Sequence, residues 1–434
     1  MARLLFAKDT TFARDFAAVI SSSRDEKTDV DGVVAAILAD VKARGDDAVL
    51  DYTKKWDRLP LTADQMRFTA DDMASAERAC DKITLEALHV AAARIADYHR
   101  RQLPKDERYT DASGVTLGWR WTPVASAGLY VPGGTAALFS SVLMNAVPAK
   151  VAGVARLVVT VPTPDGKTNP LMLAACRIAG VDEVYRIGGA QAIGALAYGT
   201  RTIAAVDKIV GPGNAYVASA KKQVFGTVGI DMIAGPSEIT VVADAGNDPA
   251  WIAADLLSQA EHDPTSQSVL ITDSAKFARK VMAAVDGHLK TLPRADIARA
   301  SWTNNGAVVV VDNLQDAAAL VDRIAPEHLE LAVADAKPLL AAIRHAGAIF
   351  IGRHTPEAIG DYIAGPSHVL PTSGTARFSS GLGVLDFMKR TSIVDCSAAG
   401  LNAIGPGAVA MAKAEELEAH ALSVTIRLNI GRGS

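Results

Sequence analysis

Short apolar segments alternate with helical patterns along the chain from residue 128 onward. The segments are rich in Val, Ile and Leu and read, in order, GLYV, ARLVVTV, EVYRI, DKIV, EITVVAD, SVLITD, GAVVVVD, LELAV and AIFIG. Such alternation predicts parallel βαβ units, and near-continuous apolar strands are typical of sheets that helices cover on both faces. We therefore expect an α/β fold with two doubly wound, Rossmann-like domains that contain parallel sheets, at residues 128–236 and 237–381.

The regions that flank these two units have different patterns. Residues 27–127 carry apolar positions at helical spacing, as in VDGVVAAILADVKARG, and we expect a helical region that packs on the second α/β unit, after an N-terminal arm at residues 1–26. Residues 382–434 end in the helical stretch AVAMAKAEELEAHALSVTIRLN. This tail domain is too small to bury an apolar face of its own, so we expect it to pack on another domain or a partner subunit.

Composition excludes several classes of protein. With 434 residues, of which 49% are hydrophobic and 21% charged, the chain should fold rather than remain disordered. Its 44 basic and 48 acidic residues give a net charge of -4, which argues against a nucleic-acid partner. No apolar stretch reaches the roughly 18 residues that a membrane helix needs, and the first apolar run is too short for a signal peptide, so we expect a cytoplasmic protein without a membrane partner.

Glycine-rich turns follow strands of the first α/β unit, in VPGGTAALFSS, IGGAQAIGALA and VGPGNAYVASAKKQV. Such turns bring backbone N–H groups and a helix N-terminus close to an anion or cofactor, although none is a complete dinucleotide fingerprint and each could be a tight connection only. The carboxyl ends of parallel strands share one edge, where such folds bind ligands. Tyr130, Gln191 and Asn214 lie in or beside these turns and could contact a cofactor there.

Other segments carry side chains suited to metal binding or proton transfer. Gln259 and His262 are three residues apart and should share one helix face, and His262 could alternatively complement the helix dipole. In IAPEHLEL, Glu327 and His328 form an exposed carboxylate and imidazole pair, or else a solvated Glu beside a satisfied His. Asp361 ends a predicted helix, where its charge opposes the dipole and needs a compensating cation.

Two further groups of side chains, each considered alone, are most simply explained as solvent-exposed. His420 lies in an otherwise ordinary amphipathic tail helix. Lys221 and Lys222 form a short basic pair, which is more often part of a solvated face than an anion site. The cysteines, Cys80, Cys176 and Cys396, are scattered and form no CxxC pair, so any metal should use nitrogen and oxygen ligands.

Taken together, the motifs resemble the histidinol dehydrogenase family over about the whole chain. They are, in order, GLYVPGG, GGAQAI, GPGNAYV, DMIAGPSE, DLLSQAEHD, APEHLEL, GDYIAGPSHVLPT and a closing E-x-x-x-x-H helix. The resemblance implies a zinc-dependent enzyme that oxidises L-histidinol to L-histidine in two steps with two NAD, the last step of histidine biosynthesis. It also implies a homodimer with shared active sites.

The resemblance further implies a role for individual residues. The implied zinc ligands are Gln259, His262, Asp361 and His420, and the implied proton-transfer pair is Glu327 and His328. Ser237, His328, Glu415 and the zinc ligands would contact the substrate, while Tyr130, Gln191 and Asn214 would face NAD. Helix geometry places Glu416 rather than Glu415 on the face of His420, which conflicts with this assignment.

The implied residue types suit the chemistry. One carboxylate, two imidazoles and an amide oxygen leave zinc with the open coordination that a catalytic site needs. A neutral imidazole suits the removal of the alcohol proton, which points to His328, and Glu327 could activate the water that adds to the aldehyde.

Two other functions compete with this interpretation. A cysteine-dependent aldehyde dehydrogenase would need an activated thiolate beside the cofactor, and no cysteine follows a glycine-rich turn. A non-catalytic small-molecule binding protein would have no evident need for the implied ligand set together with a Glu-His pair.

Overall fold

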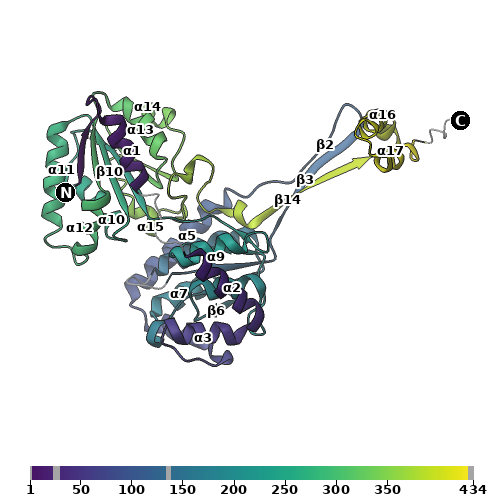
Figure 1. Ribbon diagram of the computed structural model, residues 1–434, viewed down its shortest axis with the longest axis horizontal. Helices are drawn as coiled ribbons and strands as arrows, with labels where there is room; N and C mark the ends of the chain where they lie inside the picture. Colours follow the sequence, from purple (N-terminus) through teal and green to yellow (C-terminus); the bar gives the residue numbers. More distant parts are fainter. Residues whose placement is uncertain (1, 23–29, 133–137, 429–434) are drawn as a thin grey trace. The chain divides into compact units, whose positions relative to one another are not determined.

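The structure is a computed structural model that describes residues 2–22, 30–132 and 138–428 (Figure 1). The chain forms two compact units, the larger from Met1–Gln102 and Ala125–Phe387, the smaller from Leu103–Val124 and Met388–Ser434. The larger unit contains two parallel sheets with helices on their faces, which confirms the α/β prediction. None of the helices in the described part of the chain has the length and apolar composition needed to span a membrane.

The first sheet has the strand order β6-β5-β4-β7-β8. Its strands are β4 (Ser126–Tyr130), β5 (Arg156–Thr160), β6 (Glu183–Tyr185), β7 (Lys208–Val210) and β8 (Gly229–Ile230). Counted along the chain from β4, this is the order 3-2-1-4-5 of a Rossmann-like unit, whose topological switch point lies between β4 and β7. Its helices are α6 (Phe139–Ala152), α7 (Pro170–Ile178), α8 (Gly189–Tyr198) and α9 (Ala215–Val224).

The second sheet repeats this order and adds one strand, giving β1-β11-β10-β9-β12-β13. Its strands are β1 (Arg3–Phe6), β9 (Glu238–Ala243), β10 (Gln267–Thr272), β11 (Ala307–Val310), β12 (His328–Ala332) and β13 (Ala348–Ile351). One face packs on α10 (Pro249–Ala260), α11 (Ala275–His288) and α12 (Ala295–Asn305). The other packs on α1 (Phe12–Ser22), α13 (Ala317–Ile324) and α14 (Lys337–Ala342). Part of the predicted N-terminal arm is therefore an edge strand of this sheet.

The two sheets also share their strand register. In the first sheet Ala127 of β4 lies opposite Lys208, the first residue of β7. In the second sheet Ile239 of β9 lies opposite His328, the first residue of β12. Lys208 and His328 therefore occupy equivalent positions, at the amino edge of the fourth strand of each Rossmann-like order.

The helical region packs differently from the prediction. It consists of α2 (Asp31–Arg44), α3 (Asp46–Trp56), α4 (Ala70–Ala79) and α5 (Lys82–Arg100). Helices α2 and α3 contact α8, α4 contacts α7, and α5 contacts α6, all in the first α/β unit. Helix α5 also contacts the second unit, where Arg94 donates to two backbone carbonyl oxygens. Leu38 and Val41 of α2 lie close to Gly194 of α8, where a Cβ atom would meet both side chains. An apolar stripe indicates that a helix face is buried, but not which surface buries it.

The smaller unit joins residues that the sequence analysis separated. Its antiparallel sheet, β14-β3-β2, combines β2 (Glu107–Thr110) and β3 (Val115–Pro123) from the region predicted as helical with β14 (Met388–Cys396) from the tail. Two helices follow, α16 (Ala398–Ala414) and α17 (Glu418–Thr425). The predicted continuous tail helix is thus interrupted, with Glu416 in the left-handed region at φ +59°. The helix geometry that opposed Glu415 therefore does not apply.

Candidate active site at the amino edge of the second sheet

A proline-led turn positions Glu327 and His328 at the start of β12. Helix α13 ends at Ile324, and Ala325 adopts a left-handed conformation, φ 49°, before Pro326. Proline disfavours the helical conformation of the residue before it and so prevents continuation of the helix. Glu327 and His328 are only 6% and 3% exposed, so the prediction of an exposed pair is wrong.

Both side chains of this pair are fixed on one residue, Glu238 at the start of β9. The backbone N–H of Glu238 donates to Oε2 of Glu327 at 2.8 Å. Nδ1 of His328 donates to the backbone carbonyl oxygen of Glu238 at 3.0 Å. This contact orients the imidazole and leaves Nε2 as the atom available for proton transfer.

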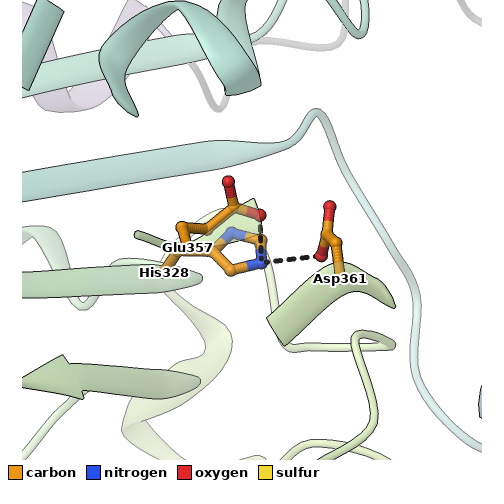
Figure 2. A group of neighbouring side chains, drawn as sticks. All are labelled: His328, Glu357 and Asp361. Atoms are coloured by element: carbon orange, nitrogen blue, oxygen red, sulfur yellow. Dashed lines mark ion pairs between the residues drawn. The ribbon is translucent and has the colours of Figure 1, made fainter. Parts of the chain in front are cut away.

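Nε2 of His328 faces two carboxylates (Figure 2). It lies 3.7 Å from Oε1 of Glu357 and 3.7 Å from Oδ1 of Asp361. Burial lowers the pKa of His328, but attraction to the surrounding carboxylates, Glu327 first, outweighs burial and raises this pKa to about 10. Burial raises the pKa of Glu327 to about 8. His328 and Glu327 therefore each hold a proton more tightly than the isolated side chain would.

Asp361 lies in the short helix α15 (Ala358–Tyr362) and is compensated by imidazoles. Its Oδ1 is 3.7 Å from Nδ1 of His368 as well as from His328. Burial opposes ionisation, but the nearby His328 and His368 imidazoles outweigh burial and keep the pKa of Asp361 below its ordinary value. His328, whose pKa is raised, supplies the compensating cation that was expected near Asp361, whereas burial lowers the pKa of His368.

Glu357 is a third side chain of this centre, and no sequence motif pointed to it. This side chain is 1% exposed, and its Oε2 accepts a hydrogen bond from Oγ of Ser258 at 2.9 Å. Burial, followed by repulsion from Asp361, raises the pKa of Glu357 to about 7. Its i,i+4 spacing to Asp361 places both carboxylates on one helix face, and this spacing was the signal available in the sequence. His328, Glu357 and Asp361 offer ligand atoms within 4.8 Å of one another.

Gln259 and His262 lie at the C-terminal end of α10. Gln259 is fully buried, and neither atom of its amide has a hydrogen-bond partner among the described residues. His262 follows the helix and is accessible at the surface. Desolvation by neighbouring atoms lowers the pKa of His262, while the Asp361 carboxylate acts in the opposite direction, so the two side chains are within electrostatic range.

These side chains fit a divalent metal. An unsatisfied buried amide costs about 1 to 3 kcal/mol, so the orphaned Gln259 amide favours a ligand at that place. An amide oxygen, an imidazole nitrogen and a carboxylate oxygen are donors that zinc accepts. The larger unit supplies Gln259, His262 and Asp361 of the predicted ligand set, whereas His420 belongs to the smaller unit, where it is exposed.

A cavity of about 400 Å³ adjoins the centre. His328, Asp361 and His368 line one part of it, and Tyr98 and Gln102 line another. This volume suits a small molecule. Of the predicted substrate contacts outside the ligand set, Ser237 is half-buried beside Glu238, while Glu415 is exposed in the smaller unit.

The predicted cofactor residues gather at the carboxyl edge of the first sheet. Tyr130 ends β4, and its buried hydroxyl oxygen accepts a hydrogen bond from the N–H of Gly189 at 3.1 Å. Gln191, 1% exposed, has a side-chain oxygen without a hydrogen-bond partner in the described part of the chain. Asn214 caps α9 by accepting hydrogen bonds from two backbone N–H groups. Part of the VPGGT turn, residues 133–137, lies outside the described residues.

The cysteines do not form a covalent catalytic site. Burial raises the pKa of Cys176 to about 12, and partial burial also raises the pKa of Cys80. Both thiols are therefore protonated at neutral pH, unlike an activated nucleophile. Cys396 is exposed on β14 of the smaller unit.

A dinucleotide-type switch point in one sheet and a buried imidazole and carboxylate centre in the other are features that suit an oxidoreductase. Comparison with known families matches residues 20–428 to histidinol dehydrogenase. The chain belongs to the histidinol dehydrogenase family.

Individual relatives agree along the whole chain. It is 64% identical over 428 residues to the histidinol dehydrogenase of Rhodospirillum rubrum, covering 98% of this chain and 99% of the relative. It is 61% identical to that of Bradyrhizobium diazoefficiens, with 96% and 97% covered. The crystal structure of histidinol dehydrogenase from Elizabethkingia anophelis matches with a TM-score of 0.94 at 35% identity and covers 99% of this chain and 98% of that chain.

Proposed function

We propose that the protein oxidises L-histidinol through L-histidinaldehyde to L-histidine and reduces two NAD, with one zinc ion in each active site. The observation that carries this proposal is the orientation of His328, whose Nδ1 is fixed on Glu238 while Nε2 faces Asp361 and Glu357. A base oriented in this way, in a buried centre beside a cavity, suits removal of a hydroxyl proton.

Gln259, His262, Asp361 and His420 would hold the metal. When bound, zinc would polarise the substrate oxygen and bind substrate nitrogen, and NAD would accept a hydride in each oxidation. A positive charge bound to Asp361 would offset one of the carboxylates that keep the pKa of His328 high. The imidazole would then shift toward the neutral form that a base requires.

His328 and Glu327 divide the proton transfers in this proposal. Nε2 of His328 accepts the hydroxyl proton of the alcohol in the first oxidation and a proton of the aldehyde hydrate in the second. The Glu327 carboxylate accepts a proton from the water that adds to the aldehyde. The raised pKa of Glu327, about 8, makes its ionised form a stronger base than an ordinary carboxylate.

Tyr130, Gln191 and Asn214 would face NAD at the carboxyl edge of the first sheet. Two observations support this place. The edge contains the switch point between β4 and β7, and the buried side-chain oxygen of Gln191 has no hydrogen-bond partner among the described residues. A hydrogen-bond donor of the cofactor could satisfy that oxygen.

The smaller unit would complete the site of a second copy. Large apolar side chains of this unit are exposed, with Val394 at 69%, Met411 at 68% and Ile426 at 66%. Exposed apolar surface of this kind is typical of an interface between proteins. In a homodimer, docking of this unit on the partner would bring Glu415 and His420 to the partner's Ser237 and zinc ligands.

A steady-state assay tests the function. NADH formation from L-histidinol should be abolished by a chelator and restored by added zinc. A protein that forms no NADH with histidinol after zinc is added would contradict the proposal.

A complementation experiment tests the shared site. Inactive His420→Ala and inactive His262→Ala proteins should regain activity after subunits are exchanged, because one of the two sites in a mixed dimer receives both intact ligands. With half of the dimers mixed, recovery should approach about a quarter of wild-type activity. Verified exchange without recovery would show that His420 serves its own chain.

A further inference from the structure

A buried ion pair lies behind the turn that joins β7 to α9. It joins Lys221 of α9 to Asp231, the residue after β8, and the two side chains are 2% and 0% exposed. The prediction that Lys221 and Lys222 form a solvated face is therefore wrong for Lys221. It is correct for Lys222, whose side chain is 67% exposed and lies 3.6 Å from Asp31.

The pair holds both sides of Gly211, the first residue of the turn Gly-Pro-Gly-Asn. Oδ2 of Asp231 accepts a hydrogen bond from the N–H of Gly211 at 2.8 Å. Nζ of Lys221 donates to the carbonyl oxygen of Gly211 at 2.9 Å and also to Asp231. The ion pair thus fixes the two peptide groups that flank the Cα atom of Gly211.

Gly211 also lies against the backbone of Tyr130 in β4. Its φ is +109°, and a Cβ atom there would collide with the backbone oxygen of Tyr130, so glycine is required. Asn214, which caps α9, follows three residues later. We call the Lys221–Asp231 ion pair the clamp. It sets how the turn that carries Asn214 lies against the strand that ends in Tyr130.

Stability alone does not explain the pair. Desolvation of two charges is costly, and replacement of buried ion pairs by apolar residues is often neutral or stabilising. The surrounding helices and strands already share an apolar core. The gain from the pair lies in a fixed conformation of the turn at the switch point.

We propose that Lys221 and Asp231 are positioning residues that hold the Gly211 turn in its NAD-binding conformation. This inference rests on the proposed NAD site. A turn that is already fixed loses less conformational freedom when the cofactor binds, so the clamp should act on NAD affinity. It should have little effect on the chemical steps, whose residues lie on the second sheet.

The test compares a Lys221→Met/Asp231→Asn double variant with the exposed control Lys222→Met. The double variant removes both charges and keeps an oxygen that can accept the N–H of Gly211. We expect the Kd for NAD, measured by calorimetry, and the KM for NAD to rise about tenfold. The kcat at saturating NAD and the KM for histidinol should stay within about twofold, and the control should match wild type.

A folded double variant whose Kd for NAD stays within about twofold of wild type would overturn the inference. Where the double variant fails to fold, Lys221→Gln/Asp231→Asn decides in the same way, because it leaves no unpaired buried charge and keeps polar groups at both positions. An Asn214→Ser variant, which keeps the cap of α9, separates the two possible failures. If it weakens NAD binding while the clamp variants do not, only the clamp fails. If none of these variants changes NAD affinity, the proposed NAD site fails as well.

Discussion

The amino edges of the two parallel sheets have the same geometry but differ in what they leave available. Asp207, directly before β7, accepts a hydrogen bond from the N–H of Ser126 at the start of β4, at 2.9 Å. Glu327, directly before β12, accepts one from the N–H of Glu238 at the start of β9, at 2.8 Å. Glu327 therefore ties two strands together in addition to its proposed part in catalysis.

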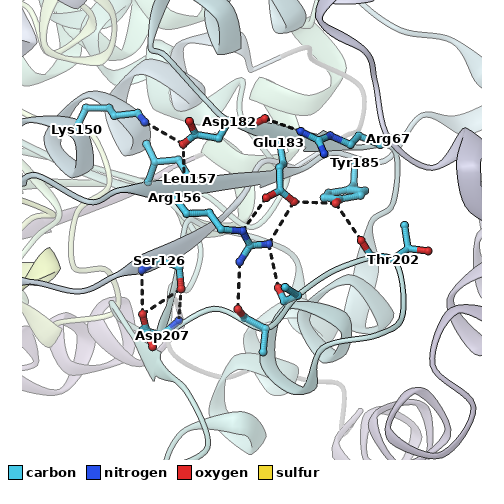
Figure 3. A network of polar contacts seen from close by, with 12 residues as sticks. Arg67, Ser126, Lys150, Arg156, Leu157, Asp182, Glu183, Tyr185, Thr202 and Asp207 are labelled. Atoms are coloured by element: carbon cyan, nitrogen blue, oxygen red, sulfur yellow. Dashed lines mark hydrogen bonds and ion pairs between the residues drawn. The ribbon is translucent and has the colours of Figure 1, made fainter.

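Beyond this shared contact the edges diverge. At the amino edge of the first sheet, polar side chains form hydrogen bonds and ion pairs with one another (Figure 3). Arg156 pairs with Glu183 at 2.7 Å and donates to two backbone carbonyl oxygens, and the hydroxyl of Tyr185 donates to Glu183 at 2.8 Å. At the second edge, His328 takes the place of Lys208, and its Nε2 lies beyond hydrogen-bond length from the carboxylates it faces.

The difference shows how one fold uses the same edge in two ways. Charged groups that are paired with each other stabilise the fold and have little left to offer a ligand. Buried groups such as the Gln259 amide, which has no hydrogen-bond partner in the described part of the chain, cost stability unless a ligand satisfies them. The second edge is therefore suited to binding and chemistry, and the first to stability.

The greatest loss of activity is expected at His328, and none at Lys208, the equivalent residue of the first sheet. Replacing His328 with Ala should lower kcat for histidinol and for histidinaldehyde by about 10³-fold, because general acid and base catalysis contributes roughly 10²- to 10⁴-fold. Lys208→Ala should leave both rates within about twofold. NADH formation from each substrate measures the effect. A similar loss in both variants would remove the distinction between the two edges.

Metal content separates the proposed zinc ligands from His328. Asp361→Ala should weaken zinc binding by more than about 100-fold, since loss of even an outer-shell partner costs roughly 10- to 100-fold. Gln259→Ala should weaken it less, because an amide oxygen is a poorer ligand. His328→Ala should retain its zinc. Metal analysis after dialysis checks all three, and loss of zinc from His328→Ala would instead assign the metal to His328, Glu357 and Asp361.

The Glu327→Gln variant separates the contact of Glu327 between two strands from its proposed role as a base. Glu327→Gln keeps an oxygen for the N–H of Glu238, so the strands should stay tied, but it removes the base. Histidinaldehyde oxidation should slow about 100-fold, while histidinol oxidation to the aldehyde should change by less than about threefold. Asp207→Asn, the matched change at the first edge, should affect neither rate. Equal slowing of both half-reactions by Glu327→Gln would contradict the division of labour.

Periodicity predicted the fold well because its information is local. The apolar segments from GLYV to AIFIG all became parallel strands, and the turn at Pro326 was visible from its proline. The pairing of residues 115–123 with 388–396 could not be predicted, because it joins segments more than 260 residues apart. The break after α16 was also missed, because the residue that adopts the left-handed conformation there is Glu416 and not a glycine.

The candidate site was harder to locate by general rules. Open parallel sheets bind ligands at their carboxyl edges, and the first sheet follows this rule in the proposed NAD site. The buried centre lies at the amino edge of the second sheet, where the C-terminal end of α10 and the start of β12 meet. Its candidate residues stood out by their types and took their roles from the resemblance, while Glu357 was missed because its only signal was its i,i+4 spacing to Asp361.

A modest loss of stability is expected when Glu183, at the amino edge of the first sheet, is changed. Partial burial raises the pKa of Glu183, but its hydrogen bonds with Arg156 and Tyr185 outweigh burial and lower that pKa below its ordinary value. A lowered pKa in the folded state stabilises the protein above the unfolded pKa of about 4.3, and this contribution is lost as pH falls through the folded value. Glu183→Gln should therefore lower the free energy of unfolding at pH 7 by about 1 to 2 kcal/mol, with kcat unchanged. In urea unfolding the difference from wild type should shrink as the pH is lowered below about 4, because protonation then removes the same charge from wild type. A difference that persisted at low pH would mean that the shape of the side chain, and not its charge, stabilises this edge.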